Sequence, residues 1–240
     1  MISLIRPTDL SGYKALIPSI GVGNVAQLAV DLIIATLKLE RIGTGWHSAL
    51  MPVFGPPAYH HDNVNKTTSL EVYANQELKL VVFQIRSPLV ASLVDRFHQD
   101  LLEFLAANKF SEVIILTSSH AYEKHSVETS PFEYIANEQF KSLHKDTLDK
   151  QNWPEFTNNV LHGGGNGKKL LALCTERDIP AFLLFKYVSE GDNSPDASQL
   201  LGELNKLHKL FERDENGQVK FTTPLSWNLL FGNEPPELIF

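Results

Sequence analysis

Four short apolar runs along the chain each predict a buried β-strand. The runs cover residues 15–20, 80–85, 113–117 and 181–185. They show little polar alternation, which is typical of strands that are covered on both faces and belong to a largely parallel sheet. A fifth segment, 71–74, alternates between polar and apolar residues in the manner of a strand.

Helical patterns separate these strands. The clearest covers residues 90–108, where apolar side chains recur at intervals of three and four. Residues 24–38 are apolar nearly all round and predict a buried helix. Further helices are predicted over 136–150, over 168–177 and from 194 onward. Because strand and helix alternate, the sequence predicts an α/β fold, a three-layer sandwich with a mostly parallel central sheet.

The chain reads as one domain. A length of 240 residues is acceptable for a single α/β domain. We find no internal repeat and no linker, so we expect one domain over 1–240, with an extended, Pro-rich and aromatic tail over about 223–240.

Composition and charge narrow the function classes. The net charge is −7, which argues against a broad basic face for nucleic acid. The single cysteine, Cys174, excludes an intramolecular disulfide and zinc sites that need several cysteines, and we expect its thiol to be buried and inert. No apolar run approaches the roughly 18 residues of a membrane span, and no signal peptide is evident. We expect a cytoplasmic and nuclear protein without membrane or nucleic-acid partners.

The turn 21–26 fits the pattern G-x-G-x-x-A between a strand and a helix, which can bind a dinucleotide. Asn24 is predicted to cap the helix, with Gln27 completing a capping box. A dinucleotide site also needs an acidic residue at the end of the second strand. Glu40 has the required spacing, but it is predicted to end a helix. We therefore predict a tight turn that needs glycine for backbone reasons, and no cofactor.

A second glycine-rich segment, 163–169, lacks the spacing and the Ser or Thr of a phosphate-binding loop. Its first residues, with His162 before them, resemble the oxyanion loop of hydrolases. That loop requires a G-x-S-x-G nucleophile elbow, which this sequence does not contain. A turn that opens a helix explains the segment better.

Residues 117–120, Thr-Ser-Ser-His, follow a central strand at its carboxyl end, where open α/β sheets bind ligands. Ser119 and His120 offer a nucleophile and a base for a phosphorylase- or hydrolase-like enzyme acting on a small molecule. However, adjacent residues rarely face each other. The favoured interpretation is that the hydroxyl groups satisfy backbone groups at the strand end. The neighbouring pair His60 and His61 with Asp62 is interpreted as a solvated loop and not as a metal site.

Several motifs remain that no enzyme class explains, and they occur in a fixed order over nearly the whole chain. They are Val22–Ala29 with Asp31–Ile34, Ser118–His120 with Tyr122, Gly163–Gly165, Phe185–Asn193 with Pro195–Ala197, Leu225–Trp227, Leu229–Gly232 and Pro235-Pro236. By this set the chain resembles the proteasome assembly chaperone 2 family. The block Val188–Asn193, continuing into Pro195–Ala197, is the most specific part of the resemblance.

The resemblance implies a chaperone subunit without catalytic activity. Members of this family pair with proteasome assembly chaperone 1 as a heterodimer, and the pair helps the α-subunits of the proteasome core particle to form their ring. The implied fold is similar to the nucleoside phosphorylase-like architecture, without its catalytic groups. Fold alone does not carry that function.

Related assembly factors insert a C-terminal tail with a hydrophobic-Tyr-any motif between α-subunits, and the last three residues here are Leu238, Ile239 and Phe240. Leu238 fits the motif, but Ile239 replaces the Tyr, so its phenolic hydrogen bond is lost. The terminal carboxylate can still meet a pocket lysine, a contact of about 1.5–3 kcal/mol. The alternative is that the tail packs on its own domain or on the sister chaperone through Trp227 and Phe231.

Overall fold

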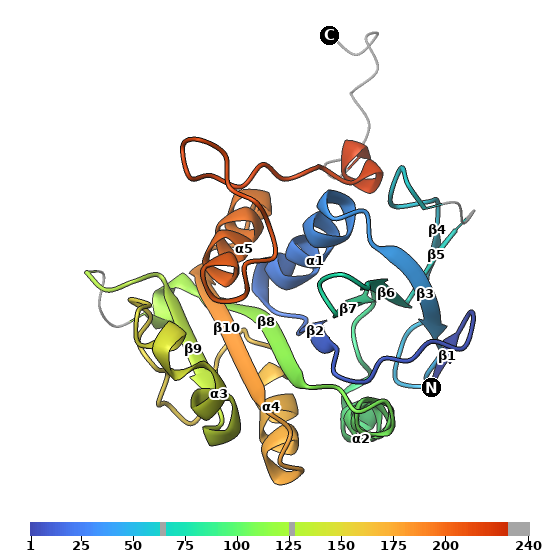
Figure 1. The fold of residues 1–240 in the computed structure, drawn as a ribbon, viewed down its shortest axis with the longest axis horizontal. Helices are drawn as coiled ribbons and strands as arrows, with labels where there is room; N and C mark the ends of the chain where they lie inside the picture. Colours follow the sequence, from blue (N-terminus) through green and yellow to red (C-terminus); the bar gives the residue numbers. More distant parts are fainter. Residues whose placement is uncertain (63–65, 125–127, 230–240) are drawn as a thin grey trace, which may run out of the picture.

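A central sheet of eight strands separates two layers of helices in the computed structural model (Figure 1), which describes residues 1–62, 66–124 and 128–229. In spatial order the strands are β1 (Ile2–Leu4), β3 (Glu40–Gly45), β6 (Leu70–Asn75), β7 (Leu80–Ile85), β2 (Lys14–Pro18), β8 (Glu112–His120), β10 (Ala181–Val188) and β9 (Phe132–Ala136). Two short strands, β4 (Phe54–Gly55) and β5 (Thr67–Thr68), form a separate ribbon.

The middle of the sheet is parallel. Strands β7, β2, β8 and β10 pair in parallel, and all four correspond to the continuous apolar runs of the sequence. Strand β6 is antiparallel to β7, and β3 is antiparallel to β6, so β3 runs in the same direction as the central four. Five of the eight strands therefore share one direction, which confirms the prediction of a mostly parallel sheet. Strands β1 and β9 are antiparallel to their neighbours.

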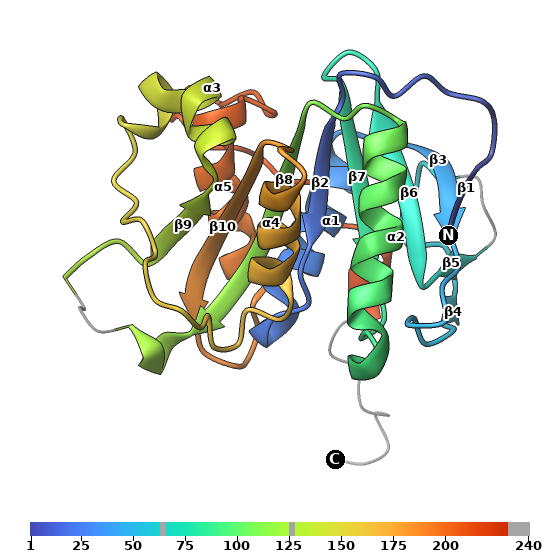
Figure 2. The same cartoon turned by 90° about the horizontal axis from the view of Figure 1, so that it is seen from below.

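Helices cover both faces of the sheet. They are α1 (Val25–Thr36), α2 (Val94–Ala107), α3 (Glu138–Leu148), α4 (Gly167–Glu176) and α5 (Ser194–His208). Helices α1 and α5 lie on one face, and α2 and α4 lie on the other (Figures 1 and 2). Four 3-10 turns complete the secondary structure: η1 (Val22–Asn24), η2 (Ala91–Leu93), η3 (Ala121–Glu123) and η4 (Leu225–Leu229). The three-layer sandwich is thus confirmed. Within the described ranges, no helix has the length and apolar character needed to span a bilayer.

Side chains of the central strands point alternately into two separate hydrophobic cores. In β2, Leu16 packs beneath α1 and α5, whereas Ala15 and Ile17 pack beneath α2 and α4. The same alternation separates Phe182 from Leu183 in β10. Because side chains of a strand alternate between faces, a strand with two covered faces must be apolar at every position. This explains the four continuous runs.

Two local predictions were wrong. Asn24 stands at the N-cap position of α1 but does not cap the helix with its side chain, because its backbone is left-handed (φ 51°). Glu40 does not end a helix but opens β3, where Arg6 forms an ion pair with it. A dinucleotide-binding acid would stand at the opposite, carboxyl end of that strand. The thiol of Cys174 is buried, as predicted, and burial raises its pKa to about 12.

Candidate functional site

The carboxyl ends of β2 and β8 carry four buried hydroxyl groups, which we call the hydroxyl row: Ser19, Thr117, Ser118 and Ser119. All four donate to backbone carbonyl oxygens of neighbouring loops. Ser19 Oγ and Thr117 Oγ1 donate to the carbonyl of Gly164, at 2.9 and 3.0 Å. Ser118 Oγ donates to the carbonyl of Val22 at 2.6 Å, and Ser119 Oγ donates to that of His162 at 2.8 Å. The hydroxyl row therefore fastens η1 and the glycine-rich loop to the strand ends.

Close backbone contact explains why this loop is rich in glycine. Gly165 has φ +59°, and a Cβ atom at this position would lie 2.1 Å from the carbonyl oxygen of Ile20. A Cβ atom on Gly21 would lie 2.8 Å from both the Ser118 and Thr117 hydroxyl oxygens. The glycine-rich turns thus bring backbone against backbone at the place where open α/β sheets usually hold a ligand.

The structure does not bring Ser119 and His120 together as a nucleophile and base. The hydroxyl group of Ser119 donates to a carbonyl oxygen, and the ring of His120 stacks on Tyr122 with centroids 4.8 Å apart. A cavity of about 310 Å³ lies beside Ser119, walled in part by Phe156 and His162. The hydrogen bonds match the structural interpretation of this motif, in which the hydroxyl groups satisfy backbone carbonyls.

The loop His60–Asp62 is more engaged than its polar sequence suggests. His61 Nε2 lies 3.1 Å from the carbonyl oxygen of Leu39, and Asp62 accepts a hydrogen bond of 3.1 Å from Tyr73 Oη. His60 is exposed. Among the described residues, no three His, Cys, Asp or Glu side chains gather in a metal-binding group.

A buried charged network lies between α1 and the sheet, and no local sequence pattern predicts it. Asp31 of α1 accepts from Tyr59 Oη at 2.5 Å and from Gln84 Nε2 at 2.6 Å, and Arg86 reaches it at 3.2 Å. Burial disfavours the charged form of Arg86, but Asp31 together with Tyr59, Glu71 and Tyr73 outweighs this and raises the pKa of Arg86 above its ordinary value. Hydrogen bonds and ion pairs around Asp31 therefore fix α1 on the sheet.

The same aspartate anchors the C-terminal segment. Trp227 Nε1 donates to Asp31 Oδ2 at 3.4 Å, and the backbone N–H of Ser226 donates to the carbonyl of Ala58 at 3.1 Å. Further back, the N–H of Thr222 donates to Thr36 Oγ1 at the end of α1. Trp227 therefore packs on its own domain. The predicted partner-binding residues Leu238, Ile239 and Phe240 lie outside the described residues, as does Phe231.

Large apolar side chains are exposed on the loop after β3. We call them the 46–54 patch: Trp46, Met51, Val53 and Phe54. Trp46 is 75% exposed and Phe54 is 71% exposed, and both line a surface hollow of about 240 Å³ together with Val53. Contiguous exposed apolar surface of this kind marks protein contacts, where Trp and Phe are enriched.

The base of this loop is held firmly. His47 lies beneath the patch, where its Nε2 is 3.1 Å from Asp100 and its Nδ1 accepts from the N–H of Ala49 at 2.9 Å. Its ring also meets the edge of Phe97 at 5.4 Å. The N–H of Val90, itself partly exposed, donates to the carbonyl of Ala49 at 2.8 Å. The patch is thus presented on a preformed support, which lowers the ordering cost of binding.

Comparison with known proteins decides the family. The family model described as the PAC2 family matches residues 15–213, most of the chain. This chain belongs to the PAC2 family.

Full-length relatives support the membership. The chain is 36% identical to Proteasome assembly chaperone 2 of Xenopus laevis, covering 94% of this chain and 93% of that one. It is 32% identical to the human protein of the same name, covering 97% and 96%. Among solved structures, Pyrococcus furiosus PbaA, an archaeal homologue of proteasome-assembly chaperone, superposes with a TM-score of 0.71. That likeness covers 90% and 89% of the two chains at 16% identity, and it shows that the PAC2-family fold is shared.

Proposed function

We propose that this chain is a chaperone subunit that pairs with proteasome assembly chaperone 1 and promotes assembly of the α-ring of the proteasome core particle. The carrying observation is the identity of 32–36% to relatives named Proteasome assembly chaperone 2, over nearly the full length of both chains. Identity at this level over a whole chain supports a shared role better than a shared fold does.

The site geometry supports a binding role over an enzymatic one. The hydroxyl groups at the carboxyl ends of β2 and β8 are bonded to the chain's own loops, and that of Ser119 donates to the carbonyl of His162. The 46–54 patch, in contrast, exposes large apolar side chains on a firm support. We infer that the protein acts by contact with other polypeptides and catalyses no reaction.

We assign separate partners to the two surfaces. Permanent heterodimers have more apolar interfaces than transient complexes. We therefore assign the 46–54 patch to the contact with proteasome assembly chaperone 1. The tail residues Leu238, Ile239 and Phe240 are proposed to bind proteasome α-subunits, with Ile239 in the place of the motif's tyrosine. We also place this protein in the cytoplasm and nucleus.

Native mass spectrometry of co-expressed proteins tests this function. The full chain is expressed with proteasome assembly chaperone 1 and the α-subunits, and we expect a one-to-one heterodimer and its complex with free α-subunits. Finished proteasomes, added separately, should not retain the chain. Recovery of the chain only as a lone monomer under these conditions would refute the proposal.

The interface assignment has its own variant pair. Replacing Trp46 and Phe54 together by Ser removes the centre of the patch, and we expect the affinity for proteasome assembly chaperone 1 to fall at least tenfold. Leu143→Ser is the matched control, because Leu143 is 64% exposed on α3, away from this patch. Equal loss in both variants would contradict the assignment.

A further inference from the structure

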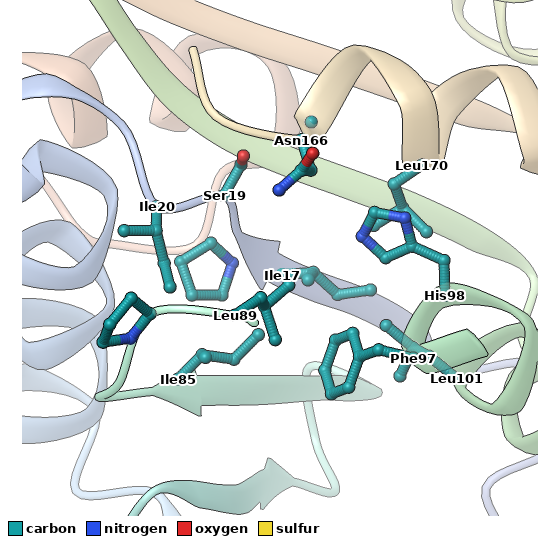
Figure 3. A pocket seen from close by; sticks show the side chains of 13 residues that line it. Ile17, Ser19, Ile20, Ile85, Leu89, Phe97, His98, Leu101, Asn166 and Leu170 are labelled. Atoms are coloured by element: carbon teal, nitrogen blue, oxygen red, sulfur yellow. The ribbon is translucent and has the colours of Figure 1, made fainter. Parts of the chain in front are cut away.

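A cavity of about 180 Å³ lies between α2 and α4, next to the carboxyl ends of β2 and β7 (Figure 3). Most of its wall is apolar and comes from Ile17, Ile85, Leu89, Phe97, Leu101 and Leu170. Its volume resembles that of a cavity of roughly 150 Å³ that is able to hold benzene. The cavity shares Ser19 with the hydroxyl row and is lined by none of the residues of the 46–54 patch.

One polar side chain in this wall lacks a partner. His98 of α2 is only 4% exposed, and among the described residues its Nδ1 has no hydrogen-bond partner. Figure 3 shows the His98 ring directed into the cavity, on the side where Asn166 also points. An unpaired polar side chain in an apolar wall is unfavourable, so a ligand group that pairs with the His98 ring would gain affinity.

The start of a helix forms another part of the cavity wall. Asn166 and Gly167, which line the cavity, form the start of α4. The side chain of Asn166 does not cap this helix, and its first turn holds no acidic residue. The first backbone N–H groups of a helix lack partners within it and carry a partial positive charge, which favours an anion.

The protonation state of His98 suits the same ligand. Burial, with a smaller contribution from the charge of Lys169, lowers the pKa of His98 to about 4, although Asp95 opposes this. The ring is therefore neutral at pH 7 and can donate one N–H. Lys169 itself forms an ion pair with Asp95.

We propose that this cavity binds a small, mainly apolar molecule that ends in one carboxylate. The carboxylate accepts hydrogen bonds from the N–H of the His98 ring and from the first backbone N–H groups of α4, while the hydrocarbon part fills the space beside Phe97, Leu101 and Leu170. This site is independent of the proposed assembly role.

The first test uses the unmodified full chain and three probes of one size. Benzoate carries the carboxylate, benzamide is its neutral counterpart, and toluene has no polar group. In a ¹H–¹⁵N NMR titration at pH 7.5, we expect benzoate to shift the amides of Gly167, Leu170 and Leu101 in a saturable way. Its affinity should exceed that of benzamide at least fivefold. Equal affinities for benzoate and toluene, or no saturable shift with any probe, would overturn the proposal.

The second test removes the polar atom and keeps the ring. For His98→Phe, we expect at least a fivefold loss of benzoate affinity and no preference for benzoate over benzamide. His60→Phe, at an exposed histidine, is the matched control and should behave as the unmodified chain. Unchanged binding by a folded His98→Phe would refute the role of His98. If that variant does not fold, the NMR shift of the His98 ring nitrogens on adding benzoate to the unmodified chain decides, and unshifted ring nitrogens refute the role of His98.

Discussion

At the scale of single residues, hydrogen bonds between side-chain hydroxyl groups and loop carbonyls hold the loops against the carboxyl ends of β2 and β8. The hydroxyl row supplies donors to loop carbonyls, and glycine lets these loops come close enough to accept them. Side chains that a catalytic interpretation would assign to chemistry are thus occupied in holding backbone. Replacing either a hydroxyl donor or a loop glycine should therefore lower the free energy of unfolding and leave the binding of other proteins unchanged.

Gly165→Ala tests the backbone half of this arrangement. The new Cβ atom would meet the carbonyl of Ile20, and φ +59° is strained for alanine, so we expect the free energy of unfolding to fall by about 2 kcal/mol or more. Two controls separate the causes. Gly12→Ala has the strained φ but open space around it, and Gly202→Ala sits in α5 with open space. We expect a loss of about 1 kcal/mol for the former and a small gain for the latter, measured by urea unfolding.

The hydroxyl half is tested by Ser119→Ala combined with His120→Ala. The double variant loses the hydrogen bond to the carbonyl of His162, so we expect a loss of about 1 kcal/mol in stability with unchanged pairing to proteasome assembly chaperone 1. Ser142→Ala, at an exposed helix position, is the control. The enzyme alternative makes the opposite forecast. It requires a metabolite, followed by mass spectrometry in a cell extract, that the unmodified chain consumes and the double variant does not.

At the scale of elements, Glu112 links β8, α3 and α5 at the edge of the layer that holds α1 and α5. Its carboxylate, at the start of β8, lies 2.6 Å from His144 Nε2 of α3 and 3.7 Å from His208 Nδ1 of α5. His208 is buried, and the burial lowers its pKa to about 3. Burial acts against the charge of Glu112 too, yet the hydrogen bond from His144 and the nearby charges of His208, His144 and Lys14 together lower the pKa of Glu112.

This junction predicts acid sensitivity. The unfolded chain protonates His208 near pH 6.5, whereas the folded chain does so only near pH 3, so the unfolded state binds more protons between these values. Stability must therefore fall as the pH falls, by about 2 kcal/mol from this residue between pH 6.5 and 4.5. The lowered pKa of Glu112 adds a loss in the same direction at lower pH.

Urea unfolding at several pH values measures this slope. We expect His208→Phe to flatten the fall in stability above pH 4.5, whatever its effect on absolute stability. His60→Phe, at an exposed residue, should leave the slope intact. A slope in His208→Phe equal to that of the unmodified chain would show that the acid sensitivity arises elsewhere.

The elements that the sequence predicts well are those with a strong pattern of their own. The central strands were predictable because two covered faces demand a continuous apolar run. Strand β9 was missed because three of its five residues are only half-buried, so its pattern is weak. The cap on Asn24 failed for a tertiary reason, since η1 lies against the residue before α5, where a Cβ on Gly23 would meet the side chain of Asn193. The 46–54 patch and the pairing of Asp31 with Arg86 depend on contacts between distant segments, which no local pattern encodes.

At the scale of the whole molecule, the 46–54 patch and the C-terminal segment lie on different elements of the sandwich. The patch follows β3, while the C-terminal segment runs beside α1 and is tied to it through Trp227 (Figure 1). If each surface serves a separate partner, as we propose, the two binding events are separable by mutation. Sites that share no residues usually contribute additively.

Deleting Leu238–Phe240 is the test of this separation. Loss of the apolar side chains and of the terminal carboxylate's position should weaken binding to α-subunits at least tenfold, because a charge-assisted contact of about 1.5–3 kcal/mol would be lost. Pairing with proteasome assembly chaperone 1 should remain, as should the melting temperature. The Trp46 and Phe54 double variant should give the reverse pattern in the same pull-down. Ile239→Tyr, which restores the motif's phenol, should strengthen α-subunit binding; if deletion and restoration both leave that binding unchanged, the tail is not the contact.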